Sequence, residues 1–349
     1  MGVTRVDDWT AEYDAIIDVR SPAEYEDDHI PGAISLPALS NEERARVGTV
    51  YKQVSAFEAK KLGAALISRN LAKHIETYFL DKPGGFQPLI YCWRGGQRSG
   101  SFALVLAEIG FLPNTLIGGY KGYRNDVLER LESLPGQFQY RVVSGKTATA
   151  KTRFLDALRE AGGQVLDLEG LANHKGSMFG LTPGEQQPSP RGFDSLVVET
   201  LRHFDPAKPV WVESESPKIG QLFVPKALHH ALRGAPGIRL DAPLEARVQH
   251  SMEDYRPWFD HKDAVRDRLE RLTYRHGHAQ IADWLAFLDD EDWKGLVRAL
   301  LVDHYDPAYA GSAKAYGWDE GEPLLLPDLS PETIKKAAHQ TLRRFTGEG

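Results

Sequence analysis

Cys92 is the only cysteine among the 349 residues, and its neighbours are of the types that support a reactive thiol. Arg94 and Arg98 follow it closely, with Gly95 and Gly96 between them. Cationic groups and helix N-termini lower a thiol pKa below about 8.5, which populates the nucleophilic thiolate at neutral pH. This stretch does not have the composition of a hydrophobic core. We therefore favour a reactive Cys92 over a buried cysteine that acts as a small hydrophobe.

The chain around Cys92 has the pattern of a strand, a loop and a helix. Residues 89–91 are typical of a buried strand, and the apolar residues at 102–109 have helical spacing. Such a unit directs loop amides and a helix N-terminus at one point, which favours an anion there. A further predicted strand at 15–19 ends in a charged turn at the same type of sheet edge. We predict a catalytic site formed by Cys92, Arg94, Arg98, Asp18 and Arg20.

A second strand, loop and helix follows at 139–160, with the layout of a P-loop. Its loop reads Gly145-Lys-Thr-Ala-Thr-Ala-Lys151-Thr152, and P-loops bind phosphates through backbone amides and a lysine. Ala150 stands where the motif has its second glycine, and its Cβ penalises a positive φ, so we expect a distorted loop. The alternative is a plain turn with a solvated lysine. The predicted phosphate-binding residues are Gly145, Lys146, Thr147, Thr149, Lys151 and Thr152.

Carboxylates follow the next two predicted strands. Residues 164–169 end in Asp167 and Glu169, and residues 210–216 carry Glu213 and Glu215. Such groups hold Mg²⁺ or act as bases, and Thr152 with Glu213 would hold the metal. Helix capping by Ser214 or Ser216 is an alternative explanation for one of these acids. The polar, glycine-rich and aromatic segment between the strands suits a substrate loop. The substrate loop and the acids together give six candidate site residues: His174, Ser177, Gln187, Ser189, Glu213 and Glu215. A lone histidine such as His174 is, however, more often structural.

About the first 135 residues resemble a rhodanese domain. The resemblance rests on Asp18-Val-Arg-Ser-Pro-Ala-Glu24-Tyr25, His29-Ile-Pro-Gly-Ala33, the Cys92 loop and Gly118-Gly119-Tyr120. It implies that Cys92 carries a persulfide or perselenide. Five residues separate Cys92 from Arg98, one more than in many rhodaneses. That spacing is shared with cysteine phosphatases, but their usual histidine before the cysteine is missing here.

With the second half included, nearly the whole chain resembles the tRNA 2-selenouridine synthases. The additional motifs are His174-x-Gly-Ser-x-Phe-Gly180, Gln187-Pro-Ser189 and Glu213-x-Glu-Ser-x-x-Ile-Gly220. The resemblance implies that selenium replaces sulfur in the wobble 2-thiouridine of tRNA through an S-geranylated intermediate. Geranyl diphosphate and selenophosphate would be co-substrates, Cys92 the selenium carrier, and a selenophosphate-supplying enzyme a partner. Ala148, Ala150 and Pro217 depart from the family pattern, which bears on phosphate affinity.

Length and composition predict two α/β domains. We expect a rhodanese-like domain at 1–136 and a P-loop-like parallel domain with a helical C-terminal part at 137–349. One cysteine excludes an intramolecular disulfide, and the sequence has no signal segment and no run of about 18 apolar residues. We therefore expect a cytoplasmic protein that does not bind membranes. The oligomeric state stays open.

A predicted helix at 263–274 gives the RNA-binding hypothesis. Arg268, Arg271 and Arg275 share one face by their spacing, which would bind an RNA backbone despite the net charge of −7. An ion-paired, solvated face is the alternative. Other functions also stay open: a sulfurtransferase or cysteine phosphatase fused to a nucleotide-binding domain, a rhodanese fused to an ATP-dependent kinase, and a noncatalytic RNA-binding module.

Overall fold

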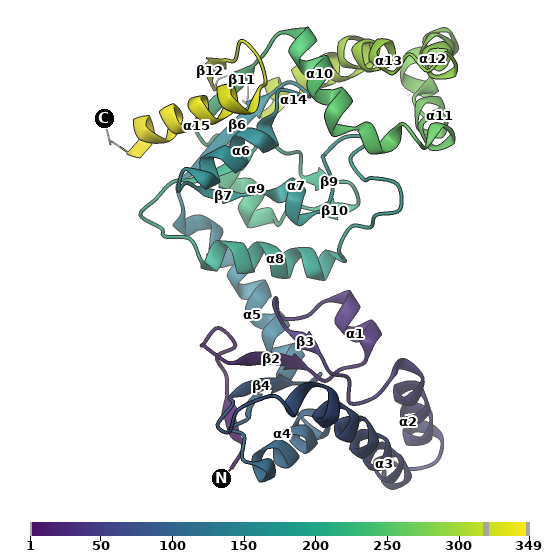
Figure 1. Cartoon of the computed structure of the whole chain (residues 1–349), viewed down its shortest axis with the longest axis vertical. Coiled ribbons are helices and arrows are strands. Elements are labelled where there is room, and N and C mark those ends of the chain that lie inside the picture. Colours follow the sequence, from purple (N-terminus) through teal and green to yellow (C-terminus); the bar gives the residue numbers. More distant parts are fainter. Residues whose placement is uncertain (1, 317–320, 347–349) are drawn as a thin grey trace. The chain divides into compact units, whose positions relative to one another are not determined.

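The computed structural model describes residues 2–316 and 321–346 and divides into two compact units (Figure 1). Unit 1 comprises Met1–Arg130 and Asp194–Leu196, and unit 2 comprises Leu131–Phe193 and Val197–Gly349. The change from one unit to the other falls inside helix α5 (Gly119–Ser133), slightly before the expected division at Gly136.

Unit 1 is built on a five-stranded sheet in the order β1-β5-β4-β2-β3, in which every pair is parallel. The strands are β1 (Thr4–Val6), β2 (Ala15–Asp18), β3 (Ile34–Ser35), β4 (Pro88–Tyr91) and β5 (Asn114–Leu116). The helices are α1 (Pro22–Asp27), α2 (Asn41–Gln53), α3 (Ala56–His74), α4 (Gln97–Ile109) and α5, with a π-helical turn η1 (Ile75–Phe79) after α3. Strand β4 is buried along its whole length, as its apolar sequence predicts.

Unit 2 contains a second parallel sheet in the order β12-β11-β6-β8-β7. Its strands are β6 (Tyr140–Gly145), β7 (Gln164–Leu166), β8 (Val210–Glu213), β11 (Gly237–Asp241) and β12 (Glu322–Leu325), and β9 (Lys218–Ile219) with β10 (Leu222–Phe223) forms a separate antiparallel pair. The neighbouring helices are α6 (Lys151–Glu160), α7 (Leu168–Leu171), α8 (Pro190–Arg202) and α9 (Lys226–Leu232), with a 3₁₀ turn η2 (Pro135–Gln137) before β6.

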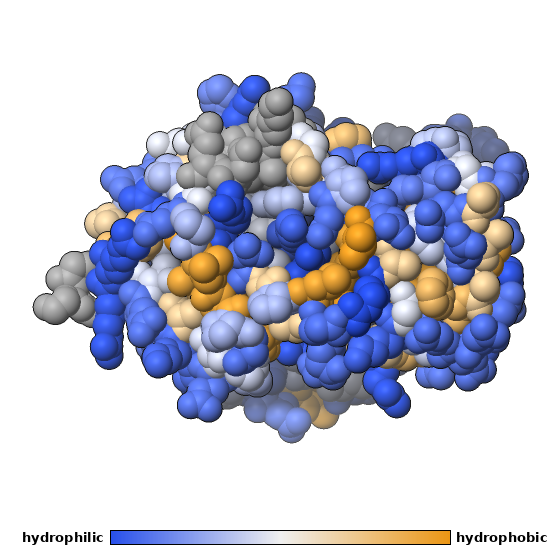
Figure 2. All heavy atoms as spheres, turned by 90° about the horizontal axis from the view of Figure 1, so that it is seen from above, coloured by the Kyte–Doolittle hydropathy of each residue, from blue (hydrophilic) through white to orange (hydrophobic). Residues whose placement is uncertain are grey.

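The C-terminal part is largely helical, as expected. It contains α10 (Leu244–Asp254), η3 (Arg256–Trp258), α11 (Lys262–Glu270), α12 (Thr273–Asp289), α13 (Trp293–Ala299), the π-helical turn η4 (Leu300–Tyr305), α14 (Asp306–Tyr316) and α15 (Pro331–Thr346). Trp258, Trp284 and Leu269 belong to a core among these helices, whereas Ala338 of α15 packs in the core of the sheet with Phe154 of α6. The view from above in Figure 2 shows a mostly hydrophilic face with small hydrophobic patches.

Two of the predicted elements have different bounds. Strand β7 ends at Leu166, and Asp167 then caps the short helix α7, which carries Glu169. The helix predicted at 263–274 ends at Glu270, and a new helix begins at Thr273. Among the described residues, no helix is both long and apolar enough to cross a membrane.

Candidate functional site

Cys92 lies directly after β4, at the end of a central strand of unit 1. Its sulfur accepts a hydrogen bond from the backbone N–H of Gly96 at 3.3 Å and lies 3.3 Å from the Ser99 hydroxyl. The thiol is 4% exposed. The strand, loop and helix predicted here are thus present, and the loop directs at least one amide at the sulfur.

The Cys92 loop packs closely against the start of α5. The backbone N–H groups of Tyr120 and Lys121 donate to the carbonyls of Cys92 and Trp93 at 2.8 and 3.0 Å. A Cβ on Gly119 would lie 2.2 Å from the Cys92 carbonyl oxygen, and φ is +56° there, so only glycine fits. This packing fixes the loop whose amides face the thiol.

The surroundings of Cys92 favour its thiolate. Burial by itself raises the pKa of the thiol, but hydrogen bonds from Ser99 and Gly96 and the charge of Arg98 outweigh burial and lower the pKa below its ordinary value. Sequence reasoning pointed to Arg98 and the loop amides but not to Ser99. A hydroxyl seven positions beyond a cysteine gives no distinct sequence signal.

Arg98 also forms an ion pair with Glu24, at 3.0 Å, and Arg44 of α2 contacts the same carboxylate at 2.8 Å. Burial raises the pKa of Glu24, but the charge of Arg98 and its hydrogen bonds lower it to about 2. Glu24 also closes a capping box with Ser21 at the start of α1. Through its ion pair, Glu24 positions Arg98 as well.

Asp18 and Arg20 form an ion pair inside unit 1, with side chains 0% and 1% exposed. Arg20 donates to Asp18 Oδ2 at 2.6 Å, and its guanidinium lies 3.8 Å from the centre of the Tyr120 ring. These contacts are those of a structural ion pair that ties β2 to α5. Arg94 is exposed. The catalytic assignments of Asp18, Arg20 and Arg94 stay predictions.

In unit 2, the predicted P-loop connects β6 to α6 and borders a hollow of about 440 Å³, which we call the phosphate hollow. Five of the six predicted phosphate-binding residues line it, namely Gly145, Thr147, Thr149, Lys151 and Thr152. Lys151 donates to the Gly145 carbonyl at 3.1 Å, inside the loop. Lys146 is not among the lining residues and pairs with Asp306 at 3.4 Å.

Ala148 and Ala150 both have left-handed backbone conformations, with φ of +66° and +59°. This conformation costs a non-glycine residue about 1–2 kcal/mol. The chain therefore keeps the backbone path of a glycine-containing loop although alanines occupy it. The effect of Ala150 is therefore backbone strain at that residue and not a different path of the loop.

Three carboxylates lie near the P-loop. Glu213 accepts a hydrogen bond from the Glu169 backbone N–H at 2.7 Å, and burial, with the charges of Glu169 and Asp167, raises the Glu213 pKa to about 8. Burial also raises the pKa values of Glu169 and Glu215, and these two line the phosphate hollow.

The pair expected to hold Mg²⁺ is not brought together as predicted. Thr152 contacts Glu169, at 3.5 Å, and Glu213 is not among the lining residues of the hollow. Over the described ranges, no group of three or more His, Cys, Asp or Glu side chains is arranged to hold a metal ion. Metal binding by Thr152 and Glu213 therefore stays a prediction. Glu169, which the sequence prediction left out of the site, takes the place beside Thr152.

The predicted substrate loop contributes His174 and Ser177 to the phosphate hollow. The Gly176 N–H donates to His174 Nδ1 at 3.1 Å, and burial, followed by the charge of Arg268, lowers the His174 pKa. Ser177 lies 3.1 Å from the Tyr255 hydroxyl. His174 and Ser177 therefore border the same hollow as Lys151.

Gln187 and Ser189 have structural contacts instead. Gln187 donates to the carbonyls of Ala172 and Ile219, both at 3.1 Å, and Ser189 caps α8 by accepting from the Gly192 N–H at 3.0 Å. Neither residue lines the phosphate hollow. These contacts hold the loop in shape, and the assignment of Gln187 and Ser189 to the substrate loop stays a prediction.

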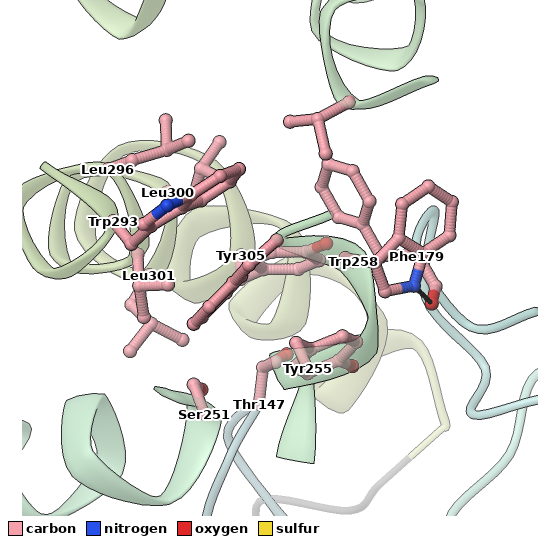
Figure 3. Close-up of a pocket in the computed structure, with 13 residues that line it drawn as sticks. Thr147, Phe179, Ser251, Tyr255, Trp258, Trp293, Leu296, Leu300, Leu301 and Tyr305 are labelled. Carbon is pink, nitrogen blue, oxygen red and sulfur yellow. Dashed lines mark hydrogen bonds between the residues drawn. The ribbon is translucent and has the colours of Figure 1, made fainter. Parts of the chain in front are cut away.

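An apolar cavity of about 60 Å³ lies next to the phosphate hollow and shares Thr147, Ser251, Tyr255 and Tyr305 with it. Figure 3 shows the Tyr305 ring among the residues of this aromatic cavity, with Thr147 and Ser251 on one side. The remaining lining includes Phe179, Trp258, Trp293, Leu296, Leu300 and Leu301. These residues come from distant parts of the chain, so sequence spacing could not reveal the cavity.

The predicted RNA-binding stripe is wrong in its geometry. Arg268 lies on α11, Arg271 is its C-cap, and Arg275 lies on α12. Arg268 turns to the Met178 carbonyl and lies 4.6 Å from the centre of the Trp258 ring, whereas Arg271 pairs with Asp267 at 2.6 Å. The single helix that would align the three side chains is therefore not present, and RNA binding by these arginines stays a prediction.

Comparison with known families gives two matches along the chain. Residues 3–126 match the family model of the rhodanese-like domain. Residues 138–317 match the family model described as the tRNA 2-selenouridine synthase AAA domain, which covers about half of the chain.

Curated relatives match over most of the chain. A tRNA 2-selenouridine synthase of Alcanivorax borkumensis is 32% identical over 84% of this chain and 88% of the relative. The protein of the same name from Bdellovibrio bacteriovorus is 37% identical over 69% and 64%. A solved N-terminal domain of a putative ATP/GTP binding protein from Clostridium difficile 630 is 37% identical and matches 36% of this chain and 99% of that one, with a TM-score of 0.31.

Proposed function

Because the chain belongs to the tRNA 2-selenouridine synthase family, we propose that it replaces sulfur by selenium in the wobble 2-thiouridine of tRNA in two steps. The observation that carries this proposal is the presence of two different sites. Unit 1 contains a thiol with a lowered pKa at the end of a parallel strand. Unit 2 contains a P-loop hollow joined to an apolar cavity.

The first step is alkylation of the sulfur by geranyl diphosphate. The base sulfur attacks C1 of the geranyl group, the C–O bond breaks, and diphosphate leaves. Lys151 and the amides of the P-loop suit the diphosphate charge. The aromatic cavity has an almost entirely apolar lining and suits part of the hydrocarbon tail, since its volume of about 60 Å³ is too small for all ten carbons. The sulfur becomes a better leaving group as a thioether.

The second step brings in selenium from selenophosphate at Cys92, where Arg98 and the loop amides favour an anion. As a selenium carrier, Cys92 would form an S–Se bond. Selenophosphate holds selenium at the level of selenide, so that bond also requires a two-electron acceptor. The Cys92 loop, which is one residue longer than in many rhodaneses, favours a second route that needs no oxidant. In this route the Cys92 thiolate attacks phosphorus, the P–Se bond breaks, and selenide is released among the loop amides. Selenide then adds at C2 of the base, the geranyl thiolate leaves, and water removes phosphate from Cys92.

Nucleoside mass spectrometry with the full-length protein, substrate tRNA and both co-substrates tests this division. Cys92→Ser should abolish 2-selenouridine and let geranylated 2-thiouridine accumulate, because alkylation needs no thiolate. Lys151→Ala should weaken geranyl diphosphate binding about tenfold or more, since a charge-assisted contact is worth roughly 1.5–3 kcal/mol, and should reduce both products. Normal selenouridine with Cys92→Ser would remove the thiol from the mechanism. Loss of geranylation in that variant would contradict the separation into two sites.

A further inference from the structure

We propose that the groove between α2, α3 and the first turns of α4 binds unpaired nucleotides of the tRNA next to the Cys92 loop. We call it the α2–α3 groove. This inference rests on the tRNA substrate of the proposed function and concerns where unit 1 holds that substrate. It assigns RNA binding to a different surface from the arginines at 268, 271 and 275.

The groove is large enough for nucleotides because small residues form its walls. It encloses about 590 Å³, and its lining includes Gly48 of α2 and Ala59, Gly63 and Ala64 of α3. A Cβ on Gly48 would have no heavy atom within 4 Å. None of the 13 residues of α2 is buried, so this helix leaves the groove open along one wall.

The two helices that form the groove are basic in an otherwise acidic chain. Residues 41–74 contain seven Lys or Arg and three Glu, a net charge of +4, whereas the whole chain has −7. Lys52 and Lys60 line the groove, and within the described residues neither forms an ion pair. Free lysines along a groove are suited to a phosphate backbone.

Exposed aromatic rings accompany these lysines. Tyr51 lines the groove with 62% of its surface exposed, and Phe57, at the start of α3, is 67% exposed. Aromatic rings beside cations are the combination that binds single-stranded nucleic acid, because each base can stack on a ring while its phosphate meets a lysine. A protein partner fits less well, since the centres of protein interfaces are depleted in lysine.

The groove also reaches the thiol site. Gln97 and Arg98, at the start of α4, are among its lining residues, and α4 begins directly after the Cys92 loop. Arg98 contributes to lowering the Cys92 pKa. Nucleotides in the groove would therefore lie next to the residue that prepares the thiolate, which is where a wobble base must arrive.

The test measures binding of an anticodon stem-loop RNA carrying 2-thiouridine to the full-length protein, by fluorescence anisotropy across a salt series. Lys52→Ala with Lys60→Ala should reduce the slope of log affinity against log salt by about 1.4, at about 0.7 for each single-strand contact. Lys208→Ala with Lys226→Ala, which removes the same charge from unit 2, should leave the slope unchanged. Tyr51→Ala should weaken binding about tenfold, whereas Tyr51→Phe keeps the ring and should bind normally.

Gly48→Leu gives a second, steric test. Leucine should fill the groove and weaken binding at least fivefold, while Gly48→Ala should have little effect, and both variants favour the helix. The proposal would be overturned if the double lysine variant kept the wild-type affinity and salt slope and if Tyr51→Ala and Gly48→Leu also bound the RNA normally. The groove would then belong to another partner. Because RNA binding needs no selenium chemistry, such a result would leave the proposed reaction intact. A wild-type protein that binds the RNA but makes no 2-selenouridine would contradict the reaction alone.

Discussion

At the scale of single residues, the Cys92 thiol is 4% exposed and yet has a lowered pKa. Burial alone would protonate it. Ser99, Gly96 and Arg98 reverse that effect, with hydrogen bonds from Ser99 giving the strongest stabilisation of the thiolate. Glu24 holds Arg98 in place from the other side, at 3.0 Å. The lowered pKa of the cysteine therefore depends on its neighbours rather than on its burial.

Ser99→Ala should raise the pKa of Cys92, because the variant loses the hydroxyl that stabilises the thiolate. The rate of alkylation by iodoacetamide as a function of pH measures this pKa directly, since the chain has no other cysteine. The matched control is Ser101→Ala, whose hydroxyl donates to the Gln97 carbonyl within α4. A pH profile of Ser99→Ala identical to that of the wild type would show that the side chain of Ser99 does not tune the thiol.

At the scale of elements, the loop between β6 and α6 keeps a P-loop path with two alanines in left-handed conformation. The two alanines differ in their surroundings. Ala150 is 3% exposed and packs in the core with Phe154, whereas Ala148 is only half-buried, although both line the phosphate hollow. The same backbone strain is thus offset by apolar burial at one position only.

Ala148→Gly should raise the free energy of unfolding by up to about 1.6 kcal/mol. Relief of the left-handed conformation is worth about 1–2 kcal/mol, and the extra freedom of glycine in the unfolded chain subtracts about 0.4–1 kcal/mol. Ala150→Gly should change stability little, because it also loses the burial of one methyl group, about 0.8 kcal/mol. Urea denaturation of both variants measures the difference. Equal effects would contradict the distinction between the two positions.

At the scale of the whole molecule, unit 2 contains buried carboxyls around its P-loop, with the Glu213 pKa raised to about 8. Glu213 is the last residue of the inner strand β8 and is 3% exposed. At pH values between its unfolded and its folded pKa, such a carboxyl is protonated in the folded protein and ionised in the unfolded chain. Folding is then penalised increasingly as pH rises from about 4.5 to about 8.

The contribution of Glu213 to the free energy of unfolding should therefore fall between pH 5 and pH 8, by a few kcal/mol, since one unit of pKa corresponds to about 1.36 kcal/mol. Burial lowers the pKa values of His250 and His304 to about 4, so these two groups contribute in the opposite direction below about pH 6.5. Glu213→Gln should flatten this dependence, because its amide oxygen can still accept from the Glu169 N–H and has no charge to lose. Urea titrations at several pH values would show the change. Glu76→Gln, an exposed position in unit 1, serves as the control and should keep the wild-type slope. A Glu213→Gln variant with the wild-type pH dependence would contradict this account.

The sequence by itself determined the features that depend on neighbouring residues. The strand before Cys92 and the strand and helix around Lys151 follow from local apolar patterns and glycine positions, which act over a few residues. The fold class follows from these patterns too, and the comparisons confirm it. The capping box at Ser21 and Glu24 is equally local.

Only the tertiary structure decided which distant side chains meet. It placed Glu169 beside Thr152 and turned Arg268 to the Met178 carbonyl. It also used Gln187 to connect Ala172 to Ile219. The aromatic cavity was assembled from residues between Thr147 and Tyr305. Strand β11 was likewise missed, although Gly237 packs so closely on Val142 that a Cβ would lie 1.9 Å from its carbonyl oxygen. Such contacts depend on the packing of whole elements against one another, and residue spacing along the chain does not encode that packing directly.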